Sequence, residues 1–234
     1  MTLRLLALAV DAHDPARLAA FWAEVLGREV VDDGRGLLLP GTATQVGLRF
    51  VASTSERVGQ NRVHLHLTSE ALGDQRRTVD RLVALGGRET DVGQLPDEDH
   101  VVVADPEGNE LCVIEAGNSY LAGCGFLGEL ACDGTREVGL FWAAALDWPL
   151  VWDQDEETAV QSPAGGTKVA WGGPPLAPRH GRDRQRFDLV ADGVSAEVER
   201  LVGLGATRLE APDARGEVVA LADPDGNEFA LSPA

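Results

Sequence analysis

Basic residues are scarce in this sequence. Lys and Arg together number 20 against 38 Asp and Glu, which gives a formal net charge of −18, and Lys168 is the single lysine. Proteins that bind nucleic acid or anionic membrane surfaces need a basic face to displace counterions. We therefore expect no nucleic acid and no membrane among the partners, and we attribute the negative charge to solubility.

Cysteines and long apolar runs are also few. The three cysteines, Cys112, Cys124 and Cys132, form no Cys-x-x-Cys pair, which argues against a disulfide framework or a structural zinc knuckle. The N-terminal apolar run is only about eight residues long, too short for a membrane span or the core of a signal peptide. We interpret it as a buried strand and expect a cytoplasmic protein.

The clearest pattern in the sequence is an internal repeat. The heptapeptide Ala-Asp-Pro-Glu-Gly-Asn-Glu at 104–110 returns at 222–228 with one change, Asp for Glu. Asp can cap its own backbone, Pro presets φ, and Gly-Asn supplies a positive φ, so each copy predicts a tight turn between two short apolar strands. The two turns are thus expected at equivalent corners of two equivalent domains.

Each half of the chain contains two βαβββ patterns. In the first, a strand is followed by a helix that starts at Asp14-Pro15 and ends at Gly27, as capping preferences predict. The other helices are predicted at 75–85, 135–146 and 195–204. The predicted fold class is α+β, with domains at 1–116 and 124–234 joined by a connector at 116–123.

Two further segments carry a family resemblance. The helix ends Phe-Trp-Ala-Glu-Val-Leu-Gly (21–27) and Phe-Trp-Ala-Ala-Ala-Leu-Asp (141–147), followed by the repeated turns, resemble the vicinal oxygen chelate superfamily in its glyoxalase-like, bleomycin-resistance-related branch. The resemblance implies tandem domains, each folding its two units into a cup-shaped mixed sheet with helices outside. The superfamily includes lyases, dioxygenases, epimerases, thiol transferases and metal-free drug-binding proteins, so it does not assign a function.

The resemblance also locates the positions that hold a metal ion in metal-dependent members. In this chain those positions are Ala7, His64 and Cys112 in the first half, and Leu127, Arg186 and Ala230 in the second. A divalent ion needs several anionic or imidazole donors that converge on one point. We therefore expect no cofactor, and a divalent metal on His64, His66 and Cys112 remains the alternative in the first half.

Strand alternation places candidate site residues in the first half. His64 and His66 share one face of a strand, and Glu110 and Cys112 share the matching face of another. These groups are expected to line a pocket for a small-molecule ligand. Acid–base catalysis by His64 or His66 on a bound carbonyl compound is an alternative. We expect a packed Cys112 rather than a nucleophile, because a reactive thiolate needs a nearby cation.

In the second half, Arg186, Asp188 and Glu228 share a face. We expect Arg186 to pair with Glu228 or Glu129 and to fill a vestigial cup. The alternative is that Arg186 binds a ligand carboxylate or phosphate. Two strand tryptophans, Trp152 and Trp171, are further candidates for stacking on a flat ligand.

The leading functional hypothesis is a glyoxalase-like protein that binds a small organic molecule without the usual metal, in a drug or metabolite binding or resistance role. One alternative is a lyase, isomerase or dioxygenase acting in the first domain with His64 and His66. Another is that the second domain is a scaffold. The sequence is compatible with a homodimer.

Overall fold

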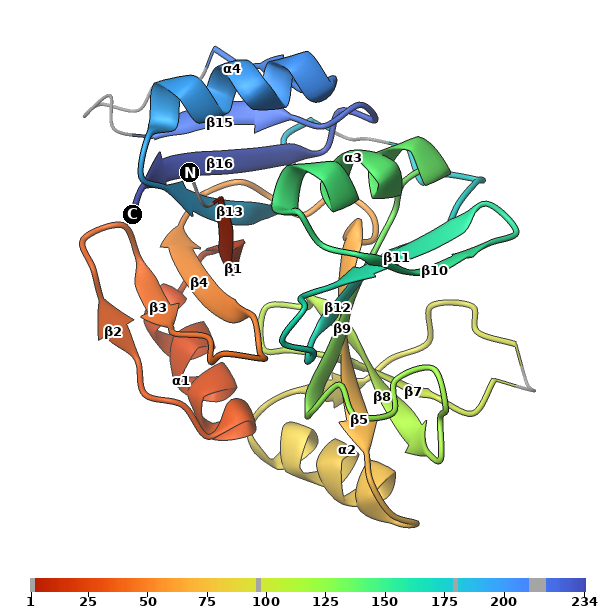
Figure 1. Cartoon of the computed structure of the whole chain (residues 1–234). Helices are drawn as coiled ribbons and strands as arrows, with labels where there is room; N and C mark the ends of the chain where they lie inside the picture. Colours follow the sequence, from red (N-terminus) through yellow and green to blue (C-terminus); the bar gives the residue numbers. More distant parts are fainter. Residues whose placement is uncertain (1–2, 96–97, 179–180, 211–217) are drawn as a thin grey trace.

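The computed structural model describes residues 3–95, 98–178, 181–210 and 218–234. Within these ranges the chain has the predicted α+β fold, built from four successive βαβββ units (Figure 1). The first unit comprises β1 (Arg4–Ala12), α1 (Pro15–Leu26), β2 (Val31–Asp32), β3 (Leu37–Leu39) and β4 (Gly47–Ala52). The second comprises β5 (Val63–Ser69), α2 (Asp74–Ala84), β6 (Arg88–Glu89), β7 (Val101–Ala104) and β8 (Glu110–Ala116).

The second half repeats this order of elements. The third unit comprises β9 (Leu127–Cys132), α3 (Arg136–Leu146), β10 (Leu150–Gln154), β11 (Glu157–Gln161) and β12 (Lys168–Trp171). The fourth comprises β13 (Gln185–Ala191), α4 (Val194–Leu204), β14 (Thr207–Arg208), β15 (Val219–Ala222) and β16 (Glu228–Pro233). No helix in the described part of the chain is both long and apolar enough to cross a bilayer.

The strands form two mixed sheets, and each sheet takes one unit from each half of the chain. Sheet A has the order β14-β15-β16-β13-β1-β4-β3-β2, and sheet B has the order β10-β11-β12-β9-β5-β8-β7-β6. The central pairs, β1 with β13 and β5 with β9, are antiparallel. The expectation that each half closes a cup from its own two units is therefore wrong. The first unit pairs with the fourth, and the second pairs with the third.

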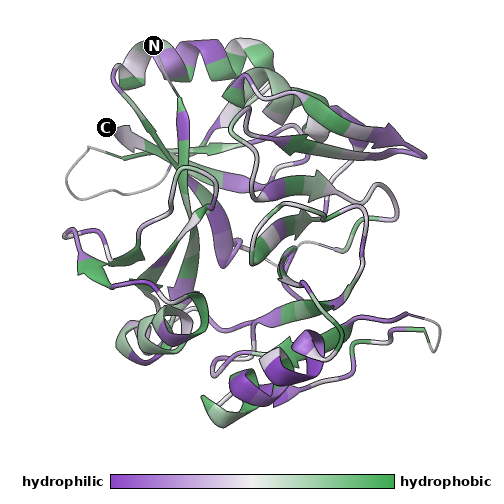
Figure 2. Cartoon of the chain, turned by 60° about the horizontal axis from the view of Figure 1, so that its bottom comes forward, coloured by the Kyte–Doolittle hydropathy of each residue, from purple (hydrophilic) through white to green (hydrophobic). Residues whose placement is uncertain are grey.

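Helices cover one face of each sheet, and the opposite face is the cup face. Helices α1 and α4 pack on sheet A, while α2 and α3 pack on sheet B. Along β5, Val63, Leu65 and Leu67 are buried in the core between strands and helices, as the predicted alternation requires. Figure 2 shows polar and apolar residues side by side along the helices, and the buried residues of α1 and α2, such as Leu18 and Leu82, are apolar. His64 and His66 consequently belong to the cup face of sheet B.

The ends of the first helix form as predicted. The Asp14 side chain accepts a hydrogen bond from the backbone N–H of Arg17 at 3.0 Å, and Pro15 occupies the first helical position. Gly27 ends the helix in the left-handed conformation with φ of 63°. In α3 this position is Asp147, also left-handed, with φ of 54°.

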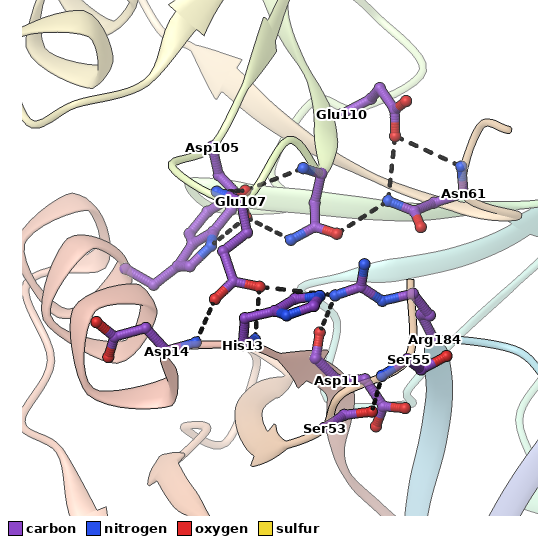
Figure 3. A network of polar contacts seen from close by, with 12 residues as sticks. Asp11, His13, Asp14, Ser53, Ser55, Asn61, Asp105, Glu107, Glu110 and Arg184 are labelled. Carbon is purple, nitrogen blue, oxygen red and sulfur yellow. Dashed lines mark hydrogen bonds and ion pairs between the residues drawn. The ribbon is translucent and has the colours of Figure 1, made fainter. Parts of the chain in front are cut away.

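The repeated turns close on their own aspartates. Asp105 Oδ1 accepts the backbone N–H groups of Glu107 and Asn109, both at 2.9 Å. Asp223 does the same for Asp225 and Asn227 in the second copy. The residue after proline then reaches a helix in the other unit of the same half: Glu107 accepts the backbone N–H groups of His13 and Asp14 (Figure 3). Each turn is therefore both a hairpin corner and a cap for a distant helix.

Candidate functional site

Three polar side chains form a row across the middle of the cup face of sheet B. On β5, His66 lies opposite Cys112 of the parallel strand β8 and opposite Glu129 of the antiparallel strand β9. The Nδ1 atom of His66 is 2.8 Å from Oε2 of Glu129. The row joins residues from both halves of the chain, so it exists only because the units pair across the halves.

Solvent reaches part of this row. The His66 side chain is 20% exposed and that of Glu129 is 5% exposed, and Cys112 is half-buried. An imidazole and a thiol with this exposure are accessible to a ligand. The Glu129 side chain is buried, so it contacts His66 rather than solvent. The predicted placement of His66 and Cys112 near one another on the cup face agrees with the structure.

The connector, predicted at 116–123, spans residues 117–126 between β8 and β9, and it contacts the row on the cup face of sheet B. The Tyr120 hydroxyl donates to Oε1 of Glu129 at 2.7 Å. Lys168 Nζ donates to the Tyr120 carbonyl oxygen and lies 3.9 Å from the centroid of the Tyr120 ring. Leu121 and Cys124 pack with Ile114 in a small separate apolar cluster. This segment therefore adds a phenol and an ammonium group to the site.

Sequence reasoning missed Tyr120 and Lys168. Its composition predicts only a link between domains, although it holds the single tyrosine of the chain. Lys168 is the single lysine and pairs in register with Glu129 on the neighbouring strand. The sequence contains one tyrosine and one lysine, and this rarity is the only feature that could have drawn attention to them. Trp152, an alternative stacking residue, has its ring centroid 5.6 Å from that of Tyr120 in an edge arrangement.

The two histidines of β5 have opposite protonation tendencies. Burial by itself would lower the pKa of His66, but hydrogen bonds to Cys112 and Glu129, together with the charge of Glu129, outweigh burial and raise this pKa to about 10. Burial lowers the pKa of His64 below its ordinary value. His66 is thus an imidazolium at neutral pH, and His64 is neutral. The Nε2 atom of His64 is buried and has no hydrogen-bond partner among the residues that the structure describes.

Glu110, predicted to face the cup, is held by neighbours at the start of β5. Its carboxylate forms an ion pair with Arg57 and accepts a hydrogen bond from the Asn61 side-chain amide at 3.1 Å. Figure 3 shows Glu110 and Asn61 directed toward each other. The charge of the Glu110 carboxylate is therefore balanced by Arg57. This carboxylate lies beside His64 and is not free to bind a ligand.

The row on sheet B does not fit a divalent metal ion. In the described ranges no three His, Cys, Asp or Glu side chains are grouped so that they could hold one. Both oxygens of Glu129 already accept hydrogen bonds or ion pairs, from Tyr120 and His66. A protonated imidazole has no lone pair to offer a metal. The donor atoms of His66 and Glu129 are committed to each other.

The cup face of sheet A is filled by ion pairs. Asp188 accepts from Arg49 Nε at 2.7 Å and from Arg35 Nη2 at 2.6 Å. Arg49 also contacts Asp33, and Arg35 donates to the Ser232 hydroxyl at 2.6 Å. The side chains of Arg49 and Asp188 are each 2% exposed. Ion pairs therefore fill this cup face, and Asp188 is one of the residues predicted to lie on it, but Arg49 and Arg35 take the place that we expected Arg186 to fill.

Arg186 has a different partner from the two that we expected. Its Nη2 atom donates to Asp11 Oδ1 on β1 at 2.7 Å. Glu129 belongs to the other sheet and pairs with His66, so the Arg186–Glu129 pair is wrong. Glu228 is half-buried, and burial raises its pKa while the nearby charges of Arg182 and Arg186 oppose that rise. Arg186 therefore lies near Glu228, but it forms its ion pair with Asp11 rather than with either expected residue.

Trp171 is placed away from both cup faces. It is 1% exposed and belongs to the central core. Beside it is a cavity of about 30 Å³ at the junction of the sheets, lined in part by Arg62 and Cys132, which is room for about one water molecule. The predicted stacking of Trp171 on a flat ligand does not agree with this position.

Comparisons with known proteins agree with this architecture. A model of the glyoxalase-like domain matches the chain twice, at residues 7–114 and 129–232. Glyoxalase I from Zea mays has 15% sequence identity and a TM-score of 0.65, with 99% of this chain and 92% of that chain covered. A candidate dioxygenase from Bacillus subtilis has 15% identity and a TM-score of 0.61, with 97% and 84% covered. At this identity the likeness concerns the fold alone.

No curated protein sequence matches the chain significantly. The two domain matches together cover most of the 234 residues and coincide with the two repeats. The fold, with four βαβββ units in two mixed sheets, is that of the vicinal oxygen chelate superfamily. The chain therefore belongs to the glyoxalase-like domain family and carries that domain twice.

Proposed function

We propose that this protein binds a small organic molecule on the cup face of sheet B, without the metal ion of metal-dependent relatives. The observation that carries the proposal is the row of Cys112, His66 and Glu129 beneath the connector. It places a charged donor, partly open to solvent, next to a buried carboxylate that also accepts a hydrogen bond from Tyr120 of the connector. Sheet A offers no comparable face, because buried ion pairs fill its centre.

The polarity of the site indicates which ligand atoms it suits. The imidazolium of His66 favours a ligand oxygen with negative or partial negative charge, such as that of a carbonyl or carboxylate group. Within the described part of the chain the buried Nε2 atom of His64 lacks a partner, and a buried polar atom without a hydrogen bond is costly. A ligand that hydrogen-bonds to His64 would relieve this cost. We assign ligand binding to His64, His66 and Cys112.

Acid–base catalysis at the same place is the second candidate. Its support is the contrast between a protonated His66 and a neutral His64 on one face of one strand. A proton donor and a proton acceptor in this arrangement suit an isomerase or lyase acting on a carbonyl compound. In this reading His66 donates the proton and His64 accepts one, and no metal takes part.

A thermal-shift screen of metabolites and antibiotics tests binding. A ligand at 100 times its Kd stabilises the folded state by about 2.7 kcal/mol, which corresponds to a rise in Tm of roughly 5–10 °C for a chain of this size. Hits are expected to lose their shift in His64→Ala and His66→Gln but to keep it in His13→Gln, whose side chain is exposed. Shifts should persist in EDTA.

Two outcomes would contradict the proposal. If the hits stabilise His64→Ala and His66→Gln as well as the parent protein, the ligand does not bind at this row. If the shifts vanish in EDTA and return on addition of a divalent ion, metal-independent binding is wrong. Turnover of a hit, followed by mass spectrometry, separates the second candidate from simple binding.

A further inference from the structure

We propose that the segments leading into β5 and β13 form a binding site for a small oxyanion that carries a hydroxyl group, of which inorganic phosphate is the simplest example. β5 and β13 are corresponding strands of the two halves, so the site lies where the halves meet. This inference goes beyond the proposed function, because the site shares no residue with the row on the cup face of sheet B.

The site is a cavity of about 50 Å³ beside the smaller cavity described above. Arg62, Asp183 and Gln185 line both cavities, so the two adjoin. Pockets for drug-sized molecules have volumes of about 300 Å³ or more, so this space suits an ion of a few heavy atoms. Arg182 also lines it, with a side chain that is 57% exposed, and an ion can enter from that side.

Arginine is concentrated in the wall of this cavity, although the chain has a formal net charge of −18. The charged residues of the lining are four arginines, Arg57, Arg62, Arg182 and Arg184, and two carboxylates, Glu56 and Asp183. A guanidinium group recognises the oxygens of phosphate and carboxylate groups well. An excess of guanidinium groups at one place in an acidic protein favours an anionic occupant.

Two of these arginines have only long ion pairs in the described part of the chain. Arg62 Nη1 is 4.0 Å from Asp133, and Arg184 Nη2 is 3.6 Å from Glu107. A charge-assisted hydrogen bond between nitrogen and oxygen measures about 2.7–2.9 Å. The two guanidinium groups are therefore not saturated by these carboxylates.

Each of the two arginines also keeps an unused N–H group. Arg62 donates through Nε to Asn227 and through Nη1 to the Ala177 carbonyl oxygen. Arg184 donates through Nη2 to the Asp11 carbonyl oxygen (Figure 3). Among the described residues nothing accepts a hydrogen bond from Arg62 Nη2 or Arg184 Nε, although both atoms are buried. A buried donor without an acceptor is costly, and an oxyanion would supply the missing acceptors.

Gln185 is a buried polar residue whose side chain the fold does not require. It is 6% exposed, and neither its Oε1 nor its Nε2 has a hydrogen-bond partner in the described part of the chain. Gln185 is the first residue of β13, whereas the first residue of the corresponding strand β5 is Val63. An apolar side chain therefore suits this position of the fold. The amide of Gln185 can donate to an oxyanion and accept from a hydroxyl group of the same ion.

Isothermal titration calorimetry of the intact protein with sodium phosphate, at pH 7 and constant ionic strength, tests the inference. One phosphate per chain is expected to bind, at least about tenfold more tightly than sulfate, because sulfate has no hydroxyl hydrogen for Gln185 Oε1. Gln185→Leu should be as stable as the parent, since it removes polar atoms that lack partners, and should weaken phosphate binding at least about tenfold. Arg136→Gln, which changes a partly exposed arginine elsewhere, should bind as the parent does.

Glycerol phosphate, titrated in the same way, distinguishes two sources of the ligand. Tighter binding of glycerol phosphate identifies the phosphate group of a larger molecule, and tighter binding of phosphate identifies the free ion. His66→Gln should keep phosphate binding, so this inference and the proposed function can fail separately.

No binding of phosphate, equal affinities for phosphate and sulfate, or unchanged phosphate binding in Gln185→Leu would overturn the inference. If Gln185→Leu does not fold, the comparison of phosphate with sulfate in the parent protein decides the question.

Discussion

The indole Nε1 of Trp22 donates a hydrogen bond to Oδ2 of Asp105 at 3.3 Å, and both residues are buried. The second half repeats the contact between Trp142 and Asp223 at 3.2 Å. The Phe-Trp motif of the helix and the Asp-Pro turn, which are far apart in the sequence, are thus the two sides of one contact. It joins the two units within each half, whereas the sheets join units across the halves.

Replacing Trp22 with Phe should lower the free energy of unfolding by about 1–3 kcal/mol, because the buried Asp105 carboxylate loses a donor. Trp142→Phe should cost a similar amount. The matched control is Trp152→Phe, since Trp152 is 36% exposed. Urea denaturation followed by circular dichroism measures the three variants. Equal stability of Trp22→Phe and Trp152→Phe would show that the indole hydrogen bond has no role.

Cutting the connector should not separate the halves. A protease site inserted after Gly123, where the backbone is exposed, would give two fragments that remain a 1:1 complex in gel filtration. The reason is that β1 pairs with β13 and β5 with β9, one strand of each pair coming from each fragment. The uncut inserted protein is the control. Elution of two independent folded monomers would contradict the cross-half pairing.

Asp188→Ala should destabilise the protein by about 3–5 kcal/mol, because it leaves Arg49 buried without its main anion. Asp153→Ala removes an ion pair with Arg136 whose side chains are 37–38% exposed, and it should cost at most about 1 kcal/mol. Thermal and urea unfolding compare the two variants. If both variants lose the same free energy of unfolding, the ion pairs on the cup face of sheet A do not form the buried network described above.

The imidazolium of His66 links stability to pH. Its pKa in the folded protein is about 10, above the ordinary value of about 6.5 expected in the unfolded chain. The stabilisation that the His66 imidazolium gives the folded state is therefore fully present below about pH 6.5 and is lost as the pH rises toward about 10. Unfolding free energies measured from pH 6 to 10 should fall by an amount that His66→Gln removes. A slope that is the same in both proteins would contradict this assignment.

Two adjacent glycines lie where the first and third units meet. Substituting each in turn tests backbone strain and steric overlap separately. At Gly166 an added Cβ would lie 1.6 Å from the Thr44 carbonyl oxygen, and φ is +93°. At Gly165 φ is +80°, and nothing lies within 4 Å of the added atom. Gly165→Ala should cost about 1–2 kcal/mol, and Gly166→Ala should cost clearly more or prevent folding. Equal Tm values would show that the units are not in contact there.

Local features of the fold were predictable because each depends on a few neighbouring residues. The Asp14 cap, the stop at Gly27 and the closure of both turns by their aspartates all formed as predicted. Strand alternation also placed His64 and His66 correctly on one face. These predictions require only the backbone preferences of single residues and the two-residue alternation of strands, and both can be read from the sequence.

Partner choice between units was not predictable in the same way. The strand pattern of β5 is satisfied equally by a partner in its own half or in the other, because alternation specifies a face and not a neighbour. Because we expected the two units of each half to pair with each other, we placed Glu129 in the same cup as Arg186 and predicted an ion pair between them. Tyr120 was missed because a connector rich in glycine has no periodic signal, although its side chain contacts Glu129.

A tandem protein contains two copies of its domain but only one segment between them. In this chain that segment, residues 117–126, contributes Tyr120 to the cup face of sheet B, and no tyrosine can do the same for sheet A, because Tyr120 is the single tyrosine of the sequence. Two copies of one fold therefore acquire unequal surroundings through being joined. The cup face of sheet B thus has a tyrosine from the joining segment next to its buried glutamate, whereas the centre of the cup face of sheet A is occupied by the Asp188 ion pairs.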